Sequence, residues 1–370
     1  MQGEKAVNID HNFFMEKALQ LALKARPSPN PRVGAVIVRN NRIIGQGWHK
    51  KAGLSHAEIN AINDAKRKGQ TDFSKCILYV TLEPCSFHGR TPACTDAIIK
   101  KGFTHVVVGA KDQNPKVSGK GFAQLRKQGI DVKQGILAQK ASDMNEGYNH
   151  YITTGKPLVI VKAALTADGK MAAKDARQKW ISNKASRKLV HEMRTKYDAI
   201  LVGIGTIMKD NPRLTSRIKQ GIDPLRIIMD SKLSLSMKSN VLADRNVIIF
   251  TSSGCDKKKK KILERRGYEI IVNEKNKVDL KKAISMLGNR GITSIMVEGG
   301  AKIISSILRK HLAEKIVLFI APKIKGGKNA PSFLVHGIEG MQKELQLKNI
   351  IRAKLGNDTM LKADIDKASR

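Results

Sequence analysis

The sequence has few aromatic residues and few cysteines, and it lacks any long apolar run. Aromatic side chains make up 4% of the 370 residues, so few are available to stack on nucleic-acid bases. Four cysteines are too few for a disulfide scaffold. The longest apolar stretches, such as 199–208, are far shorter than the roughly 20 residues that cross a bilayer. No signal-peptide pattern opens the sequence, so we expect a cytoplasmic protein without membrane contact.

Acidic residues are also scarce relative to basic ones. Lysine and arginine together number 68 and aspartate and glutamate 32, which gives a formal net charge of +36. The excess is spread over both halves of the chain, whereas a nucleic-acid-binding arm would concentrate it. A diffuse positive charge is equally typical of enzymes for small anionic substrates and of lysine-rich proteomes. We therefore expect no nucleic-acid partner.

The first part of the chain alternates between helical and strand patterns. Apolar residues at helical spacing over 14–25 end before a proline-rich loop. Short β-branched runs follow at 33–38, 77–82 and 105–109, with helical stretches between them. This alternation predicts a layered α/β domain over residues 1–150.

A second α/β domain is expected over residues 151–370, after a turn-rich segment at 153–157. A run of five lysines at 257–261 is expected to form the solvated start of a helix. Strands of this domain are expected at 158–163, 199–203, 226–230, 247–251, 269–272, 294–298 and 316–321.

Four residues of the first domain form a pattern typical of zinc-dependent hydrolytic enzymes. His56 and Glu58 lie at the start of a predicted helix, Cys85 follows a predicted strand, and Cys94 begins another helix. One histidine and two cysteines suit a zinc ion that keeps one position open for water. Glu58 would move protons between that water and a leaving amine, as in zinc deaminases with an H-x-E...P-C-x-x-C pattern. A structural alternative is a capping box formed by Ser55 and Glu58.

The loop between the two cysteines has eight residues instead of the usual two. It contains Arg90 and Thr91, which are suited to bind a phosphate or a polar substrate edge. We expect the helix dipole to lower the pKa of the Cys94 thiol and to favour the thiolate. Cys76 and Cys255 have no comparable neighbours and are expected to lie in the core or on the surface.

These motifs resemble the bifunctional deaminase-reductase family of riboflavin biosynthesis, on the segments NPRVG (30–34), HAE (56–58), TLEPCS (81–86), GRTPAC (89–94) and DQNP (112–115). The resemblance implies a cytidine-deaminase-like three-layer fold, with Zn²⁺ on His56, Cys85 and Cys94 and with Glu58 as the proton shuttle. It implies deamination of a phosphoribosylated diaminopyrimidine, contacted by Asn30, Arg90 and Asn114.

One position departs from that family pattern. Phe87 stands where the family usually has a histidine, so His88 or a stacking Phe87 would have to replace a pyrimidine contact.

Two glycine-containing turns of the second domain are weak indications of a nucleotide site. Gly203 and Gly205 form half of a dinucleotide-binding motif, in which Met208 takes the place of the third glycine. Gly299 and Gly300 follow a predicted strand and open a helix whose backbone N–H groups suit a phosphate.

The second domain resembles the reductase of the same family along nearly its whole length, on segments such as TADGK (166–170), HEMR (191–194), DNPRLT (210–215) and VEGG (297–300). The resemblance implies a dihydrofolate-reductase-like α/β fold that uses NADPH to reduce the ribosyl group to ribityl. It places the phosphorylated substrate against Gln178, Arg194, Leu214, Arg217 and Glu298. It places the cofactor against Ala164, Trp180, Thr206, Asp210, Ser231, Gly299, Gly300, Ala301, Lys302, Ile303, Ile304, Ser305 and Ser306.

Simpler interpretations exist for two of these residues. Taken alone, Arg194 would pair with a nearby acid and Asp210 would start a turn. No residue of the second domain is identified as a general acid, and orientation of the cofactor would then be the protein's main contribution.

The sequence therefore predicts one homo-oligomeric enzyme with a zinc-dependent deaminase in residues 1–150 and an NADPH-dependent reductase in residues 151–370. A nucleic-acid base deaminase is disfavoured by the long cysteine loop, the second domain and the few aromatic residues. A non-catalytic RNA-binding protein with structural zinc would need a fourth protein ligand, for which His88 is the only nearby candidate.

Overall fold

The structure is a computed structural model, which describes residues 9–89, 91–171, 180–327, 331–334 and 344–366. Two of the expected substrate contacts, Arg90 and Gln178, lie outside the described residues. The chain divides into two compact units, Met1–Gly155 and Lys156–Arg370. Within the described part of the chain, no helix has both the length and the apolar character that crossing a membrane requires.

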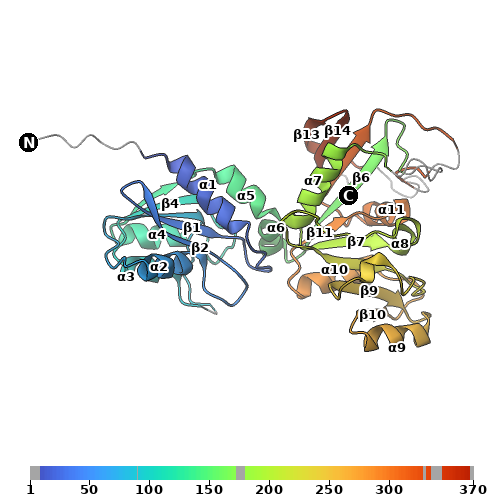
Figure 1. The fold of residues 1–370 in the computed structure, drawn as a ribbon, viewed down its shortest axis with the longest axis horizontal. Coiled ribbons are helices and arrows are strands. Elements are labelled where there is room, and N and C mark those ends of the chain that lie inside the picture. Colours follow the sequence, from blue (N-terminus) through green and yellow to red (C-terminus); the bar gives the residue numbers. More distant parts are fainter. Residues whose placement is uncertain (1–8, 90, 172–179, 328–330, 335–343, 367–370) are drawn as a thin grey trace, which may run out of the picture. The chain divides into compact units, whose positions relative to one another are not determined.

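The first unit is built on a five-stranded sheet (Figure 1). Its strands are β1 (Gly34–Arg39), β2 (Arg42–Trp48), β3 (Ile77–Leu82), β4 (His105–Ala110) and β5 (Asp131–Gln134). They are ordered β2-β1-β3-β4-β5. β1 pairs antiparallel with β2 and β3, whereas β3, β4 and β5 run parallel. The segments that follow β3 and β4 therefore leave the sheet at the same edge.

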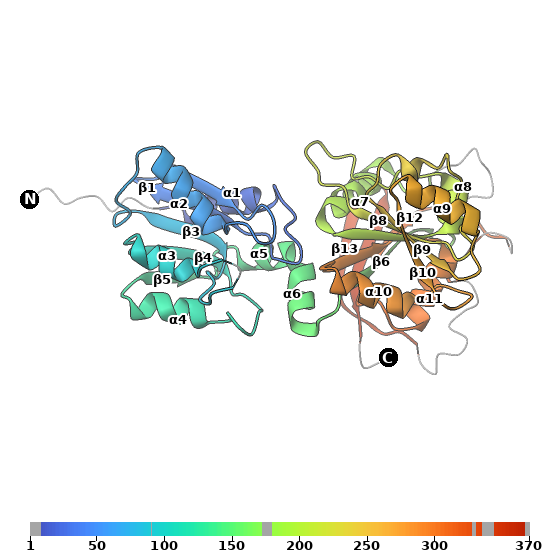
Figure 2. The same cartoon turned by 90° about the horizontal axis from the view of Figure 1, so that it is seen from below.

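Helices cover both faces of this sheet (Figures 1 and 2). They are α1 (His11–Ala22), α2 (Ala57–Arg67), α3 (Cys94–Lys100), α4 (Lys120–Lys127) and α5 (Ala138–Met144), and α6 (Glu146–Thr154) follows α5. Leu78 and Val80 of β3 pack with α2, α3 and α4, whereas Tyr79 between them packs with α1 and α5. Because successive strand residues point to opposite faces, the apolar strands bury side chains in both layers.

Glycines in β2 allow α2 to lie close against the sheet. A Cβ atom at Gly45 would lie 2.5 Å from the carbonyl oxygen of Ala61, and one at Gly47 would lie 2.3 Å from that of Ala57. Only glycine tolerates such a close approach of backbone to backbone. This packing fixes the start of α2, and His56 directly precedes that start.

The second unit is built on a nine-stranded sheet ordered β10-β9-β8-β7-β11-β6-β12-β14-β13. All neighbouring strands from β10 to β12 are parallel, and the last two pairs are antiparallel. The strands are β6 (Leu158–Thr166), β7 (Ala199–Gly203), β8 (Leu225–Met229), β9 (Val247–Ser252), β10 (Glu269–Asn273), β11 (Ser294–Val297), β12 (Lys315–Ala321), β13 (Leu347–Leu355) and β14 (Asp358–Ile365).

Helices also pack on both faces of the second sheet. They are α7 (Lys184–Lys196), α8 (Ile204–Asp210), α9 (Lys257–Arg265), α10 (Leu280–Asn289) and α11 (Ala301–Arg309), with a 3₁₀ turn at Asn240–Leu242. Ala199 and Leu201 of β7 pack with α10 and α11. Ile200 and Val202 pack on the other face with α7, α8 and α9. Such burial of both faces is typical of parallel sheets.

The continuous apolar runs of the sequence correspond to strands of the structure. The predicted strands 77–82 and 199–203 coincide with β3 and β7. The lysine run begins α9, whose N-cap Asp256 accepts a hydrogen bond from the backbone N–H of Lys259. The sequence analysis predicts none of β2, β5, β13 and β14, because β2 contains two glycines and β13 is mostly exposed. The α/β class of both domains is confirmed.

Candidate active sites

Three side chains of the first unit converge on one point. Nδ1 of His56 lies 3.2 Å from Sγ of Cys94 and 3.5 Å from Sγ of Cys85. The three potential ligand atoms all lie within 4.8 Å of one another. In a tetrahedral zinc site, a nitrogen and a sulfur ligand are about 3.6 Å apart, given their usual bond lengths to the metal. The set therefore fits a zinc ion, for which Nδ1 of His56 would be the ligand atom.

The ends of three elements place these ligands. His56 is the N-cap residue of α2, Cys85 follows the end of β3, and Cys94 is the first residue of α3. His56 makes no side-chain capping hydrogen bond, so its ring is available to bind a metal. Because His56 rather than Ser55 is the N-cap, the alternative capping box is not formed.

The two thiols differ in pKa although they lie together. Hydrogen bonds from the side chain of Cys94 and from His56 overcome the effect of burial and lower the pKa of Cys85 to about 4. The pKa of Cys94 is raised well above its usual value, because its thiol donates a hydrogen bond to Cys85 and is buried beside Glu58. The expectation that the helix dipole lowers the pKa of Cys94 is therefore wrong. Burial and neighbouring negative charge outweigh the dipole of the short α3.

Glu58 lies in the first turn of α2, beside the ligand set. It is buried, and its carboxylate lies beside the Cys94 thiol. Burial raises its pKa to about 7, although the neighbouring His56 acts in the opposite direction. A carboxyl group that titrates near neutral pH can both accept and release a proton.

Thr91 and His49 contact the ring of His56, although the sequence does not indicate these contacts. Nε2 of His56 lies 3.4 Å from the hydroxyl of Thr91, so this threonine contacts the expected ligand rather than open solvent. The buried ring of His49 packs edge-on against that of His56, with centroids 5.0 Å apart. Nδ1 of His49 lies 3.2 Å from the carbonyl of Ser55, and its Nε2 lies 3.0 Å from Nδ2 of Asn30. The sequence analysis does not single out His49.

The hydrogen bonds of His49 fix the orientation of Asn30. Because a carbonyl only accepts, Nδ1 of His49 carries the proton and Nε2 accepts from the amide of Asn30. Burial lowers the pKa of His49, which favours this neutral form. The side-chain oxygen of Asn30 is thereby turned away from His49 and offered as an acceptor.

Phe87 and His88 of the cysteine loop are both exposed. Nε2 of His88 lies 3.3 Å from a carboxylate oxygen of Asp96 on α3. His88 therefore interacts with α3, and the ligand set found among the described residues consists of His56, Cys85 and Cys94 without it. Asn114 lies farther along the chain, in the segment after β4.

In the second unit, the two glycine-containing turns meet at the ends of neighbouring parallel strands. The backbone N–H of Gly300, the N-cap of α11, donates to the hydroxyl of Thr206 on α8 at 2.9 Å. A Cβ atom at Gly205 would meet nothing within 4 Å, whereas one at Gly203 would lie 2.6 Å from Ile303. Gly203 is thus packed closely against α11, whereas the space beside Gly205 is open. Open space at this position suits a dinucleotide phosphate.

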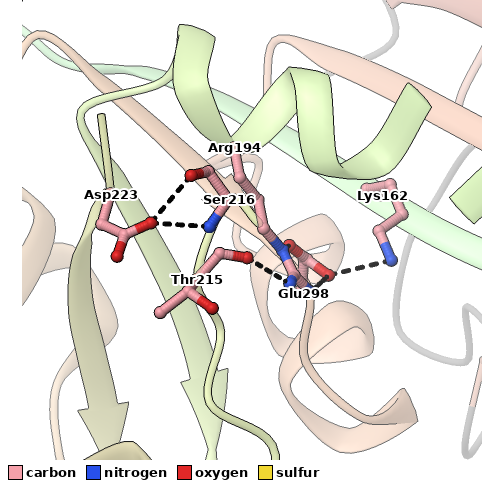
Figure 3. Close-up of polar contacts among 6 residues, drawn as sticks. All are labelled: Lys162, Arg194, Thr215, Ser216, Asp223 and Glu298. Atoms are coloured by element: carbon pink, nitrogen blue, oxygen red, sulfur yellow. Dashed lines mark hydrogen bonds and ion pairs between the residues drawn. The ribbon is translucent and has the colours of Figure 1, made fainter. Parts of the chain in front are cut away.

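A buried ion cluster lies beside these turns, at the end of β11 (Figure 3). Arg194 of α7 donates to Glu298 through Nε at 2.8 Å and Nη2 at 2.9 Å, and to the carbonyl of Thr215 at 2.9 Å. Lys162 of β6 lies 3.0 Å from the same carboxylate. Burial acts to raise the pKa of Glu298, but the charges of Arg194 and Lys162 hold it well below its usual range.

The cluster also holds the loop that contains two expected substrate contacts. Asp223 accepts hydrogen bonds from the backbone N–H and hydroxyl of Ser216, at 2.7 and 2.8 Å (Figure 3). Leu214 and Arg217 flank this point, and both have positive φ angles. Arg194 thus pairs with an acid, as its simpler interpretation predicts. Lys162, which the sequence analysis leaves without a role, is part of the same cluster.

The other expected cofactor contacts are spread over the carboxyl ends of the strands and the first turns of α11. Trp180 is 53% exposed and stacks under the guanidinium of Arg187. Ile304 is fully buried in the core, so its side chain faces away from any ligand. Ala164 lies on β6, Asp210 ends α8, Ser231 follows β8, and Ala301, Lys302, Ile303, Ser305 and Ser306 lie on α11.

The fold and the sites define a two-domain enzyme. An α/β domain with a His-Cys-Cys ligand set precedes an α/β domain whose strand ends carry glycine-containing turns suited to a nucleotide. Residues 8–110 match the family model for the cytidine and deoxycytidylate deaminase zinc-binding region. Residues 157–361 match the model for the RibD C-terminal domain.

Whole-chain relatives identify the family. The riboflavin biosynthesis protein RibD of Aquifex aeolicus is 40% identical over 360 residues, covering 95% of this chain and 98% of that protein. The protein of that name from Bacillus amyloliquefaciens is 38% identical over 359 residues, covering 95% of each chain. A crystal structure from Thermotoga maritima is similar with a TM-score of 0.77 and 37% identity, covering 96% of this chain and 98% of that chain.

This chain therefore belongs to the RibD family, the bifunctional deaminase-reductases of riboflavin biosynthesis. The predicted family and the two predicted enzymatic activities are confirmed.

Proposed function

We propose that this enzyme hydrolyses the exocyclic amine of a 2,5-diamino-6-(5-phosphoribosylamino)pyrimidin-4-one and then reduces the ribosyl group of the uracil product to ribityl. The Thermotoga maritima relative is described as a diaminohydroxyphosphoribosylaminopyrimidine deaminase and 5-amino-6-(5-phosphoribosylamino)uracil reductase. The observation that carries the proposal is the convergence of His56, Cys85 and Cys94 beside the buried Glu58.

In the deaminase domain, His56, Cys85 and Cys94 would hold Zn²⁺. When bound, the metal supplies a polarised water as the nucleophile. Glu58 takes up a proton from the attacking water and returns it to the departing amine, for which a pKa of about 7 is suited at neutral pH. Asn30, oriented by His49, offers its side-chain oxygen to an amino group of the substrate.

In the reductase domain, the cluster around Glu298 is proposed to bind the ribosyl group. Because two cations keep Glu298 ionised, its carboxylate can accept hydrogen bonds from ribose hydroxyls. Lys162 adds a positive charge at the same carboxylate. Arg194 and Asp223 fix the loop from which Arg217 would reach the substrate phosphate. The side chain of Leu214 is buried in the core, so this residue would contribute its backbone.

The cofactor proposed for this domain is NADPH, which supplies the hydride when bound. The open space above Gly205 and the N-terminus of α11 at Gly300 suit its phosphates. The contribution of the chain is to bind and orient the two partners, which alone accounts for large rate effects.

A single assay tests both activities and their order. The purified, zinc-loaded enzyme is given the phosphoribosylated diaminopyrimidine and NADPH, and ammonia release and NADPH oxidation are followed together. We expect ammonia first and NADPH consumption after it. NADPH consumption without prior ammonia release would contradict the proposed order, and the lack of both signals would contradict the proposed substrate.

The proposal includes a cytoplasmic location and a homo-oligomeric state. All four cysteines are free thiols, which is typical of a reducing compartment. β13 forms an edge of the nine-stranded sheet and exposes Ile350 and Ile351, as a strand in contact with a second subunit would. Sedimentation equilibrium of the purified enzyme tests the oligomeric state.

A further inference from the structure

The segment after β4 is held by a side chain to which the proposed mechanism gives no role, Tyr148 of α6. The phenolic hydroxyl of Tyr148 donates to Oδ1 of Asp112 at 2.9 Å. Tyr148 and Asp112 are both buried, so this bond is protected from water.

Asp112 also shapes the segment that carries Asn114. Its Oδ1 accepts the backbone N–H of Asn114 at 2.8 Å. The carboxylate of Glu83 accepts the backbone N–H groups of Asp112 at 3.3 Å and of Gly119 at 3.0 Å. Glu83 precedes the expected metal ligand Cys85 by two residues, so these bonds tie the Asn114 segment to the ligand segment.

The orientation of the Asn114 amide follows from its hydrogen bond to the neighbouring backbone. Its side-chain oxygen accepts the backbone N–H of Lys116 at 3.0 Å. The NH₂ group at the other end of the amide can only donate, so it suits a carbonyl or a ring nitrogen.

The preceding turn of α6 holds the other loop with an expected substrate contact. The side chain of Asn145, the N-cap of α6, accepts the backbone N–H of Arg32 at 2.8 Å and donates to its carbonyl at 2.9 Å. Arg32 is two residues after Asn30. Asn145 and Tyr148 thus connect one end of α6 (Figure 2) to both loops.

We propose that Tyr148 is a positioning residue of the deaminase site, which acts through Asp112 to hold Asn114 in place as a hydrogen-bond donor to the pyrimidine. Together with Asn145 it makes the start of α6 the element that sets the two substrate loops relative to each other. The proposal rests on the proposed deaminase function. A purely structural tyrosine would affect stability without selectively changing substrate binding.

The test is Tyr148→Phe, which removes only the hydroxyl. The matched control is Tyr79→Phe, because the Tyr79 hydroxyl also makes a 2.9 Å contact, to His11, in the opposite layer of the same unit. Binding of the phosphoribosylated diaminopyrimidine is measured by calorimetry in a Glu58→Gln background, and KM and kcat for ammonia release in the otherwise unsubstituted enzyme. Zinc content is measured for every variant.

For Tyr148→Phe we expect Kd and KM to rise roughly 5- to 20-fold, the effect of losing one oriented hydrogen bond, with kcat within about twofold. Zinc content should not change, and Tyr79→Phe should bind like the parent. Adding Asn114→Ala to Tyr148→Phe should cause little further loss, because Tyr148 acts on the substrate through Asn114.

Two results would overturn the inference. One is binding by Tyr148→Phe that equals that of Tyr79→Phe. The other is independent, additive losses for Tyr148→Phe and Asn114→Ala. Absence of ammonia release from the unsubstituted enzyme would instead refute the proposed function, and this inference with it.

Discussion

Replacing Glu298 by glutamine should destabilise the second domain far more than a typical single substitution. The side chains of Arg194 and Lys162 are only 11% and 13% exposed, and both are paired with this one carboxylate. Removing the acid takes from each buried cation the carboxylate it contacts, although the charge of Asp223 still acts on Arg194. Breaking a buried ion pair in this way costs about 3–5 kcal/mol. For a domain of this size, that corresponds to a melting temperature lower by roughly 6–20 °C.

The assay is thermal and urea unfolding of the full-length enzyme, in which the first domain serves as an internal reference because it lacks the substitution. We expect the transition of the second domain to move and that of the first to stay. In the double variant Arg194→Met/Glu298→Gln, the loss should be smaller than the sum of the single losses, because the two side chains interact directly. A destabilisation below about 1 kcal/mol for Glu298→Gln would refute the reasoning.

The pH dependence gives a second check on the same cluster. The pKa of Glu298 is lowered in the folded state, so between the folded and unfolded pKa values the unfolded chain binds more protons. Its stabilisation is complete above the unfolded pKa of about 4.3 and is lost as the pH falls toward the folded pKa. The stability difference between the parent and Glu298→Gln should therefore be constant above about pH 5 and shrink below it. A stability difference between the two proteins that grows as the pH falls would contradict the lowered pKa of Glu298.

Three further predictions concern the active sites. Glu58→Gln should retain zinc and reduce ammonia release by about 10²-fold or more, since the proton carrier is lost; turnover within a few-fold of the parent would remove Glu58 from this role. Cys85→Ser should lower the zinc content measured by atomic absorption, because a sulfur ligand is replaced by a weaker one, and full occupancy would contradict the ligand assignment. Arg217→Ala should raise KM for reduction by about tenfold with little effect on deamination, because it would remove a charged hydrogen bond to phosphate; equal effects on both steps would argue against separate sites.

Much of the fold follows from local patterns in the sequence. Continuous apolar runs such as 77–82 and 199–203 can only be buried on both faces, and they form β3 and β7. The candidate zinc ligands could also be found from the sequence, because His56, Cys85 and Cys94 each lie at the start or end of a helix or strand, and the topology brings those ends together. Strands such as β13, exposed and polar, lack the pattern that marks a buried strand.

The environment of each functional group was decided only by the tertiary structure. The sequence placed Cys94 at a helix N-terminus, but its pKa depends on Cys85 and Glu58, which approach it only in the folded chain. Arg194 and Glu298 are 104 residues apart in sequence and form one ion pair in the core. Tyr148 reaches Asp112 from a different element. Amino-acid patterns report local periodicity and chemistry, whereas burial, charge pairing and side-chain orientation arise where distant strand ends and helix starts meet.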